Sequence, residues 1–328
     1  MQPNVEDPVF PTLVRATECL SHHPHFRDRG AHGFSFSRQR SGTATIAYRF
    51  EAAFAQTRKS YWLKIYRSNP KDALKEWQFL NEAMAGAGAN RPLPMARPIA
   101  YLGEFAALVT EHAEGEMLAA RSRHFLQDPG GPAGGDADRA FRMAGEWLAR
   151  LHERQIPNSH QPAAALLQDI EDRAKRAHGA EKCGAAFKDR IVDLANGLVH
   201  EISPADLSRA RTHGDYGPFN IIVGGETALV LDPSFEESVD RFANFCSRYE
   251  DLARFFVYIG GALPPDASAP QRERMLFGFV AGYNAGPGQN MDRTSPAFIA
   301  FRLKYRLQAL IDWWPHPGCE PSEMVHDW

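Results

Sequence analysis

The sequence contains few cysteines, no long apolar run and no large excess of charge of either sign. Its four cysteines are spread over 328 residues without a CxxC pair, so no disulfide framework is expected and a reducing compartment is the default. No apolar stretch is long enough to span a bilayer. Residues 1–7 lack the basic start and apolar core of a signal peptide. We therefore expect a cytoplasmic protein without a membrane span.

The charge balance gives no sign of nucleic-acid binding. The formal net charge is -3 and the pI is about 6.5, so the basic footprint typical of nucleic-acid-binding proteins is missing. With 44% hydrophobic and 23% charged residues, the composition is that of a globular protein with a sizeable core. The length suggests about two domains or lobes, and the chain has no internal repeat or coiled-coil heptads.

The first third of the chain carries strand signals. Apolar and polar residues alternate at residues 45–51 and 61–66, and shorter signals lie at 34–37, 99–102 and 106–111. The segments 34–37, 45–51 and 61–66 are predicted to form an antiparallel meander. One helix is predicted to begin at the capping residue Asn69 and to end before Gly86. Ala73, Trp77, Leu80 and Met84 form its predicted inward stripe.

The remainder of the chain is predicted to be mainly helical. Apolar residues at helical spacing predict helices at 141–154, 162–201 (two helices), 249–260, 273–285 and 296–313. The glycine- and proline-rich residues 128–136 predict a loop. A small hairpin is expected at 221–223 and 228–231. The predicted fold class is therefore α+β with two lobes, and ligand sites favour the cleft between such lobes.

One motif carries most of the functional information. Residues 212–220 read Thr-His-Gly-Asp-Tyr-Gly-Pro-Phe-Asn, and Asp232 follows an apolar run. Phosphoryl transfer needs a base that orients the acceptor hydroxyl and oxygen ligands that hold Mg²⁺ against the triphosphate. Asp215 and Asn220 have the D-x-x-x-x-N spacing of a kinase catalytic loop, with Gly214 where protein kinases carry arginine. An ordinary β-turn is the alternative, because Gly, Asp, Pro and Asn are common turn formers.

With these residues the chain resembles the aminoglycoside phosphotransferase and choline kinase superfamily, small-molecule kinases with a protein-kinase-like fold. Ordered landmarks run from about residue 30 to residue 260. The resemblance implies a nucleotide-binding lobe at 1–110, a hinge at 111–116 and a catalytic and substrate-binding lobe at 117–328. It also implies ATP (with GTP as the alternative) and Mg²⁺ as cofactors, and a small molecule with a hydroxyl group as the phosphate acceptor.

Each residue of the motif has an expected role. Asp215 is the candidate general base, and Asn220 and Asp232 are the candidate Mg²⁺ ligands. We expect His213 to order the loop, and Asp251 matches a family aspartate that braces it. The rival interpretation is a metal site on His213 and Asp215, which would need further ligands. For Asp232 the alternative is a turn before proline.

A lysine–glutamate pair is expected to help bind the nucleotide. Lys64 lies in the middle of a predicted strand, where its ammonium could neutralise phosphates. Glu76 on the following helix is its expected partner, with Glu82 as a weaker alternative. If Lys64 lies instead on an edge strand, it is a lysine whose ammonium simply reaches solvent.

Two further segments are expected to contact the nucleotide. The turn where a phosphate-covering loop should lie has one glycine, so an ordinary hairpin turn stays equally open; its residues are Ser41, Gly42 and Thr43. The resemblance also implies a hinge whose backbone groups bind the adenine edge; its residues are Glu111, His112 and Ala113.

The acceptor is left open by the sequence. Glu236, Glu237 and Glu250 would suit a cationic aminoglycoside or amino alcohol, and sugars or amino acids are equally allowed. Arg248 and Arg254 belong to a charged stretch that is best explained as solvated helix surface, although one arginine of that stretch could contact an anionic substrate. A solvated loop is favoured over a metal site for the histidine cluster, which comprises His22, His23 and His25.

Two other functions compete with a small-molecule kinase. A nucleotide-binding or scaffold protein without turnover could use the same fold, but Asp215, Asn220 and Asp232 are all present. A protein kinase is disfavoured because Gly214 replaces arginine and no APE-like segment follows Asp232.

Overall fold

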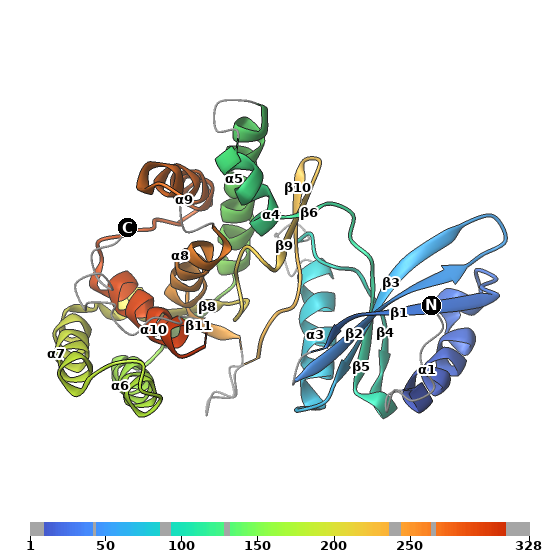
Figure 1. Ribbon diagram of the computed structural model, residues 1–328, viewed down its shortest axis with the longest axis horizontal. Coiled ribbons are helices and arrows are strands. Elements are labelled where there is room, and N and C mark those ends of the chain that lie inside the picture. Colours follow the sequence, from blue (N-terminus) through green and yellow to red (C-terminus); the bar gives the residue numbers. More distant parts are fainter. Residues whose placement is uncertain are drawn as a thin grey trace. The chain divides into compact units, whose positions relative to one another are not determined.

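The computed structural model describes residues 10–41, 44–85, 93–127, 132–235, 244–263 and 267–312 (Figure 1). The chain forms two compact units. The first contains the chain up to Gly115 together with Leu229–Phe235, and the second contains Glu116–Ala228 and the chain from Glu236 onward. The segment that carries Asp232 therefore belongs to the first unit, although it follows a long stretch of the second in sequence.

The first unit is built on one antiparallel five-stranded sheet with the strand order β1-β2-β3-β5-β4. Strand β2 pairs with β3 over its whole length, from Thr45 opposite Tyr66 to Ala53 opposite Arg58. All five strands lie where the alternating pattern predicts them, and the first three are longer than predicted. Their bounds are β1 (Gly33–Ser41), β2 (Thr45–Ala53), β3 (Arg58–Tyr66), β4 (Pro98–Leu102) and β5 (Ala107–Glu111).

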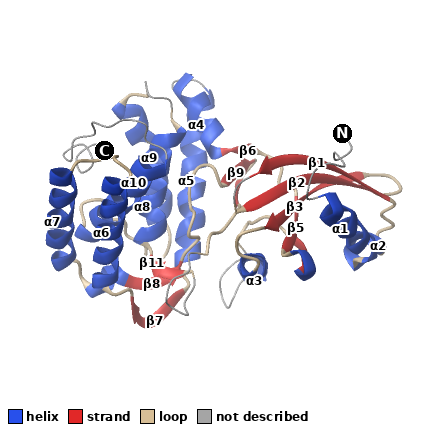
Figure 2. Cartoon of the chain, turned by 60° about the horizontal axis from the view of Figure 1, so that its bottom comes forward, coloured by secondary structure: helices blue, strands red, loops and turns tan. Residues whose placement is uncertain are grey.

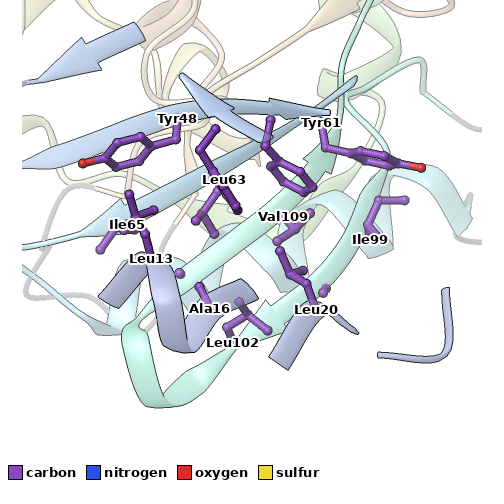
Figure 3. Packing of buried hydrophobic residues seen from close by; sticks show 14 of the residues in the cluster. Leu13, Ala16, Leu20, Tyr48, Tyr61, Leu63, Ile65, Ile99, Leu102 and Val109 are labelled. Carbon is purple, nitrogen blue, oxygen red and sulfur yellow. The ribbon is translucent and has the colours of Figure 1, made fainter. Parts of the chain in front are cut away.

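The apolar core of this unit lies between one face of the sheet and the helix α1 (Phe10–His22). Leu13, Ala16 and Leu20 of α1 join a buried cluster that includes Leu63 and Val109 of the central strands (Figure 3). Because side chains alternate across a strand, the residues next to Leu63 in β3 belong to the opposite face. That face carries Lys64.

The histidine-containing segment is helical, and the prediction of a solvated loop there is wrong. His22 ends α1, and His25 lies in the short helix α2 (Pro24–Arg27). The His25 ring meets Tyr61 edge-on at 5.8 Å between ring centroids, and its Nε2 lies 3.2 Å from the Tyr61 hydroxyl. Aromatic packing onto the sheet, which local composition does not reveal, holds this segment in place.

Helix α3 (Lys71–Ala85) presents a slightly different face from the predicted one. Asn69 accepts a hydrogen bond from the Lys71 backbone at 3.3 Å, as expected of a capping residue. Trp77 and Met84 are only partly buried. The buried side is shifted by one position along the helix and includes a carboxylate; it comprises Ala73, Glu76, Phe79, Leu80 and Ala83.

The second unit is mainly helical (Figure 2). Helices α5 and α9 are in contact, as are α8 and α10, and α10 also contacts α6 and α7. No helix in the described ranges is long and apolar enough to cross a membrane. The helices are α4 (Leu118–Gln127), α5 (Pro132–His152), α6 (Ala163–Gly179), α7 (Ala185–Glu201), α8 (Tyr249–Ala262), α9 (Ala269–Asn284) and α10 (Pro296–Asp312).

Helix α5 begins earlier than predicted. The segment 132–136 is helical rather than a loop, because Pro132 suits a helix start and Ala137, Ala140 and Phe141 bury an apolar face. Residues 128–131 lie outside the described residues. Two short sheets are ordered β10-β9-β6 and β11-β8-β7. Strands β9 and β10 confirm the predicted hairpin, whereas the other four strands were not predicted, because they pair with distant segments. The strands are β6 (Glu116–Met117), β7 (Gln155–His160), β8 (Ser208–Arg211), β9 (Ile221–Gly224), β10 (Thr227–Val230) and β11 (Phe245–Ser247), and two 3₁₀ turns span Gly103–Phe105 and Pro204–Leu207.

Glycines on both helices allow α5 and α9 to approach closely. A Cβ at Gly145 would lie 2.1 Å from the Phe279 carbonyl oxygen, and a Cβ at Gly282 would lie 2.1 Å from the Arg142 carbonyl oxygen. Neither backbone can give way without moving a whole helix. The close contact between α5 and α9 therefore depends on glycine at these positions, because glycine has no Cβ.

Replacing Gly282 with Ala should destabilise the protein by about 1–3 kcal/mol, because the added methyl group forces α5 and α9 apart. Gly197 in α7 is a matched control, since a Cβ there meets nothing within 4 Å. Gly197→Ala should raise the free energy of unfolding by about 0.5–1 kcal/mol. Denaturant unfolding of both variants measures the difference, and two effects of the same sign would contradict this account of the contact.

Candidate active site

Residues 212–220, called the 212–220 loop below, connect β8 to β9 in the second unit. Gly214 has a φ of 81°, a conformation that strains any residue with a side chain. A Cβ at Gly217 would lie 2.7 Å from the ring of Tyr258. The two glycines thus meet separate requirements of the loop, a left-handed turn and a close approach to α8.

Asp251, at the start of α8, binds the backbone of the 212–220 loop. Its carboxylate accepts hydrogen bonds from the backbone N–H of His213 at 2.7 Å and of Gly214 at 2.9 Å. It also lies 3.2 Å from Nε2 of His152, and both side chains are fully buried. Burial opposes ionisation, yet the contacts from His152 and His213 lower the pKa of Asp251 below its ordinary value. The ionised carboxylate therefore suits the bracing role expected from the sequence.

His213 is a buried part of the loop framework. It is fully buried, its ring meets Tyr216 edge-on at 5.7 Å, and its Nδ1 lies 3.3 Å from the backbone nitrogen of Asp215. Among the described residues, no group of three or more His, Cys, Asp or Glu side chains could hold a metal ion. The contacts with Tyr216 and Asp215 fit the ordering role expected of His213.

Asn220 holds Asp215 by two hydrogen bonds from one amide nitrogen. Nδ2 of Asn220 donates to the Asp215 backbone carbonyl and to its Oδ2, each at 2.9 Å. The Asp215 side chain is about one third exposed, at 36%, so an acceptor could reach it. Because both bonds use the amide nitrogen, the carbonyl oxygen of Asn220 is the atom that suits a cation such as Mg²⁺.

Arg254 also contacts the candidate base, so the prediction of a solvated helix surface is wrong for this residue. Its guanidinium Nη1 donates to Asp215 Oδ1 at 3.1 Å, and its side chain is only 7% exposed. Arg254 follows Asp251 by three positions, which puts the two on neighbouring parts of one helix face, but this spacing does not reveal that another helix covers the arginine.

Glu250 is not available to bind a cationic acceptor, contrary to expectation. Both of its carboxylate oxygens accept hydrogen bonds from Lys304 Nζ, at 2.8 and 2.9 Å, and Tyr305 also donates to it. All three residues are buried. The lysine and the tyrosine lie on α10, so the pairing depends on a contact between helices. Glu236 and Glu237 lie outside the described residues.

The first unit contains a second cluster of functional side chains, centred on Lys64. Its Nζ donates to Glu76 Oε2 at 2.9 Å and to Asp232 Oδ1 at 3.1 Å. Burial favours the neutral amine, but the carboxylates of Glu76 and Asp232 raise the pKa of Lys64 well above its ordinary value. Lys64 is therefore a fixed positive charge beside the candidate metal ligand.

Tyr66 is a member of this cluster that the sequence did not indicate. Its hydroxyl donates to the same Glu76 oxygen that binds Lys64. Tyr66 lies two residues after Lys64 on β3, so both side chains share one face of the sheet. Two donors on one buried carboxylate fix its position more firmly than the lysine alone would.

Asp232 has a special backbone conformation. Its φ is 53°, a left-handed geometry that Asp tolerates better than most residues. It follows β10, whose last residue, Val230, donates its backbone N–H to the Pro94 carbonyl at 3.4 Å. The Asp232 side chain is 39% exposed. The carboxylate is thus positioned by the first unit and accessible to a ligand.

The remaining predicted contacts are described only in part. Ser41 ends β1, whereas Gly42 and Thr43 lie outside the described residues. Glu111 ends β5, and the segment with Ala113 follows it. The Glu111 backbone N–H donates to the Arg97 carbonyl at 2.8 Å, and that of His112 to the Ser60 carbonyl at 3.0 Å. A bound nucleobase would therefore have to hydrogen-bond to backbone groups of this segment other than these two N–H groups.

Trp62 fixes the imidazole of His112. Its indole Nε1–H donates to His112 Nδ1 at 3.0 Å, so the neutral ring carries its proton on Nε2. Burial and the Arg49 guanidinium lower the pKa of His112 below 6.5. The ring is therefore neutral at pH 7, with an N–H donor directed away from Trp62.

Comparison with known proteins defines the class of this fold and site. The model of the phosphotransferase enzyme family matches residues 45–279, which is most of the chain. The chain therefore belongs to the phosphotransferase enzyme family. This confirms the resemblance seen in the sequence and the predicted α+β kinase-like fold class.

Solved structures agree with this fold. Choline kinase from Cryptosporidium parvum is 13% identical, with a TM-score of 0.56 over 92% of this chain and 89% of that chain. Spectinomycin phosphotransferase APH(9)-Ia with ADP and spectinomycin is 14% identical, with a TM-score of 0.51 over 92% and 90%. ADP-bound aminoglycoside phosphotransferase APH(2″)-Ib is 12% identical, with a TM-score of 0.53 over 95% and 97%. No curated protein sequence matches.

Protonation of the neutral His112 ring puts a hydrogen on Nδ1, so the ring can no longer accept the hydrogen bond from Trp62. Trp62→Phe removes this cost of protonation and should raise the pKa of His112 toward 6.5. In the wild type the unfolded chain binds this proton more tightly than the folded one, so acidification below pH 6.5 favours unfolding. NMR titration of the His112 ring protons measures both forms, with His112→Asn to assign the signal. A wild-type pKa above 6.5, or one that Trp62→Phe leaves unchanged, would contradict this account.

Proposed function

We propose that this protein transfers the γ-phosphate of ATP to a hydroxyl group of a small molecule. The observation that carries the proposal is the double hydrogen bond from Asn220 to Asp215, on a loop whose backbone amides are held by Asp251. It fixes a partly exposed carboxylate in the D-x-x-x-x-N arrangement of a phosphotransferase. Family membership supports the same class of reaction.

Asp215 is the general base in this proposal. Its carboxylate accepts, or at least orients, the acceptor hydroxyl proton, a contribution typically worth about 10²–10⁴-fold in rate. Its two oxygens already accept hydrogen bonds, Oδ2 from Asn220 and Oδ1 from Arg254. Each carboxylate oxygen has a second lone pair, so the acceptor hydroxyl can still approach.

The nucleotide is assigned to residues 1–110 and the hinge at 111–116, and the base and acceptor to residues 117–328. Lys64, held by Glu76, would neutralise phosphate oxygens. ATP is the proposed donor, with GTP as the alternative. Similar folds have been solved with ADP bound, which supports nucleotide use. Residues 41–43 and 111–113 remain the proposed phosphate-covering turn and base-binding segment.

Asn220 and Asp232 fit a magnesium site. The carbonyl oxygen of Asn220 and the partly exposed carboxylate of Asp232 are the hard oxygen ligands that Mg²⁺ prefers, with phosphate oxygens and water completing its shell. When bound, the ion would neutralise charge that develops on the transferred phosphate.

The competing function is nucleotide binding without turnover. One experiment separates it from catalysis: ATP consumption measured over aminoglycosides, choline, ethanolamine, homoserine, fructosamines and simple sugars. At least one acceptor should stimulate ATP consumption and yield a phosphorylated product. ATP binding with no product across the screen would favour the silent alternative, and the absence of ATP binding would remove nucleotide chemistry altogether.

Asp215→Ala should bind ATP with nearly wild-type affinity and lose phosphoryl transfer by about 10²-fold or more, because only the orienting carboxylate is removed. Product formation with the best acceptor and calorimetric ATP binding measure the two effects. Asp189→Ala is the matched control, since Asp189 is a well-exposed carboxylate on α7. Wild-type rates in Asp215→Ala would exclude this residue as the base.

Asp232→Ala should weaken binding of ATP in the presence of Mg²⁺ and leave the much weaker metal-free binding little changed. The reason is that the variant loses a metal ligand but keeps the Lys64–Glu76 pair. Calorimetry with and without Mg²⁺ measures the difference, with Asp189→Ala again as control. A metal-dependent gain in affinity equal to that of the wild type would argue against Asp232 as a ligand.

A further inference from the structure

We propose that Arg254 is a positioning residue for Asp215, and that it is itself held by Tyr305 of α10. The inference rests on the proposed function, because it assigns Asp215 the role of base. Arg254 would act through the base without touching the nucleotide or the acceptor. Tyr305 would thereby support the base from helix α10, which begins at Pro296 and follows the 212–220 loop at a long distance in sequence.

The geometry places Arg254 between the base and α10. Nη1 donates to Asp215 Oδ1 at 3.1 Å, and Nη2 donates to the Tyr305 hydroxyl at 3.0 Å. The guanidinium carbon lies 4.5 Å from the centre of the Tyr305 ring. A planar, always charged group with several donors can make both hydrogen bonds at once.

Tyr305 is in turn anchored by a buried ion pair. Its hydroxyl donates to Glu250, which accepts from Lys304 at 2.8 and 2.9 Å. Lys304 also lies 2.9 Å from Asp169 of α6. The hydrogen bonds run in one direction: Arg254 donates to the Tyr305 hydroxyl, which in turn donates to Glu250. Three helices thus fix the guanidinium.

The two oxygens of Asp215 are held from different elements. Asn220, at the end of the loop, holds Oδ2, and Arg254, on α8, holds Oδ1. Without Arg254, Asn220 alone would leave the carboxylate free to rotate about its last torsion. A misplacement of about 1 Å at a reacting group can cost on the order of 10²-fold in rate.

Four variants test the proposal. Arg254→Met should lower kcat by about 10–10²-fold with the KM for ATP unchanged. Arg254→Lys should recover only part of this loss, since an amine cannot reach both partners as the fork does. Tyr305→Phe should cost less than Arg254→Met. Arg302→Met is the matched control, a buried arginine of α10 that stacks on Phe298, and it should keep the wild-type kcat.

Chemical rescue separates positioning from a purely structural role. Guanidinium at concentrations well below those that unfold the protein should restore part of the kcat of Arg254→Ala and none of any loss in Arg302→Ala, with the folded fraction followed by circular dichroism. A wild-type kcat in Arg254→Met would overturn the proposal. So would a loss of kcat that follows the loss of folded protein and is not rescued.

Crystal structures of the wild type and Arg254→Met give a readout that does not depend on activity. The Asp215 carboxylate should rotate or occupy two orientations in the variant, and an unchanged, single orientation would overturn the inference. If the wild type transfers phosphate to no acceptor, the proposed function fails. The crystal structures still decide whether Arg254 positions Asp215.

Discussion

The 212–220 loop depends on one buried carboxylate. Asp251 accepts hydrogen bonds from the consecutive backbone amides of His213 and Gly214, shortly after the end of β8. A buried charge is tolerated only when it is well paired, and here the backbone amides and His152 supply the partners. Gly214, one of the two bound residues, adopts a left-handed conformation, and Asp215 follows it with a partly exposed carboxylate.

In each unit, an ion pair holds a charged side chain that the proposed reaction uses. In the first unit the positive charge of Lys64 is fixed by Glu76 and Asp232, and in the second the negative charge of Asp215 is fixed by Arg254. In each case one buried partner of opposite sign, Glu76 for Lys64 and Arg254 for Asp215, holds a more exposed functional group. Low dielectric strengthens these contacts and makes their loss costly. A tyrosine extends each cluster: Tyr66 donates to Glu76, and Tyr305 accepts from Arg254.

Much of the fold could be predicted because strong local signals agree with it. The strands of the first sheet follow alternation, and α3 follows its cap and apolar spacing. The failures have physical causes. Residues 132–136 are helical, despite a glycine-rich composition, because they begin a helix whose following residues Ala137, Ala140 and Phe141 bury an apolar face. The segment with His25 is ordered by aromatic packing onto the sheet, and the short strands β6, β7 and β11 exist only through pairing with distant segments.

The sequence by itself determined the residues of the 212–220 loop, the spacing of Asp215 and Asn220, and the alternation that puts Lys64 opposite the core. These features are local, so propensity and period reveal them. Only the tertiary structure decided that Arg254 and Glu250 are internal partners rather than solvated or substrate-binding charges. Their burial depends on α10, and no local pattern records which helix will cover a charged face.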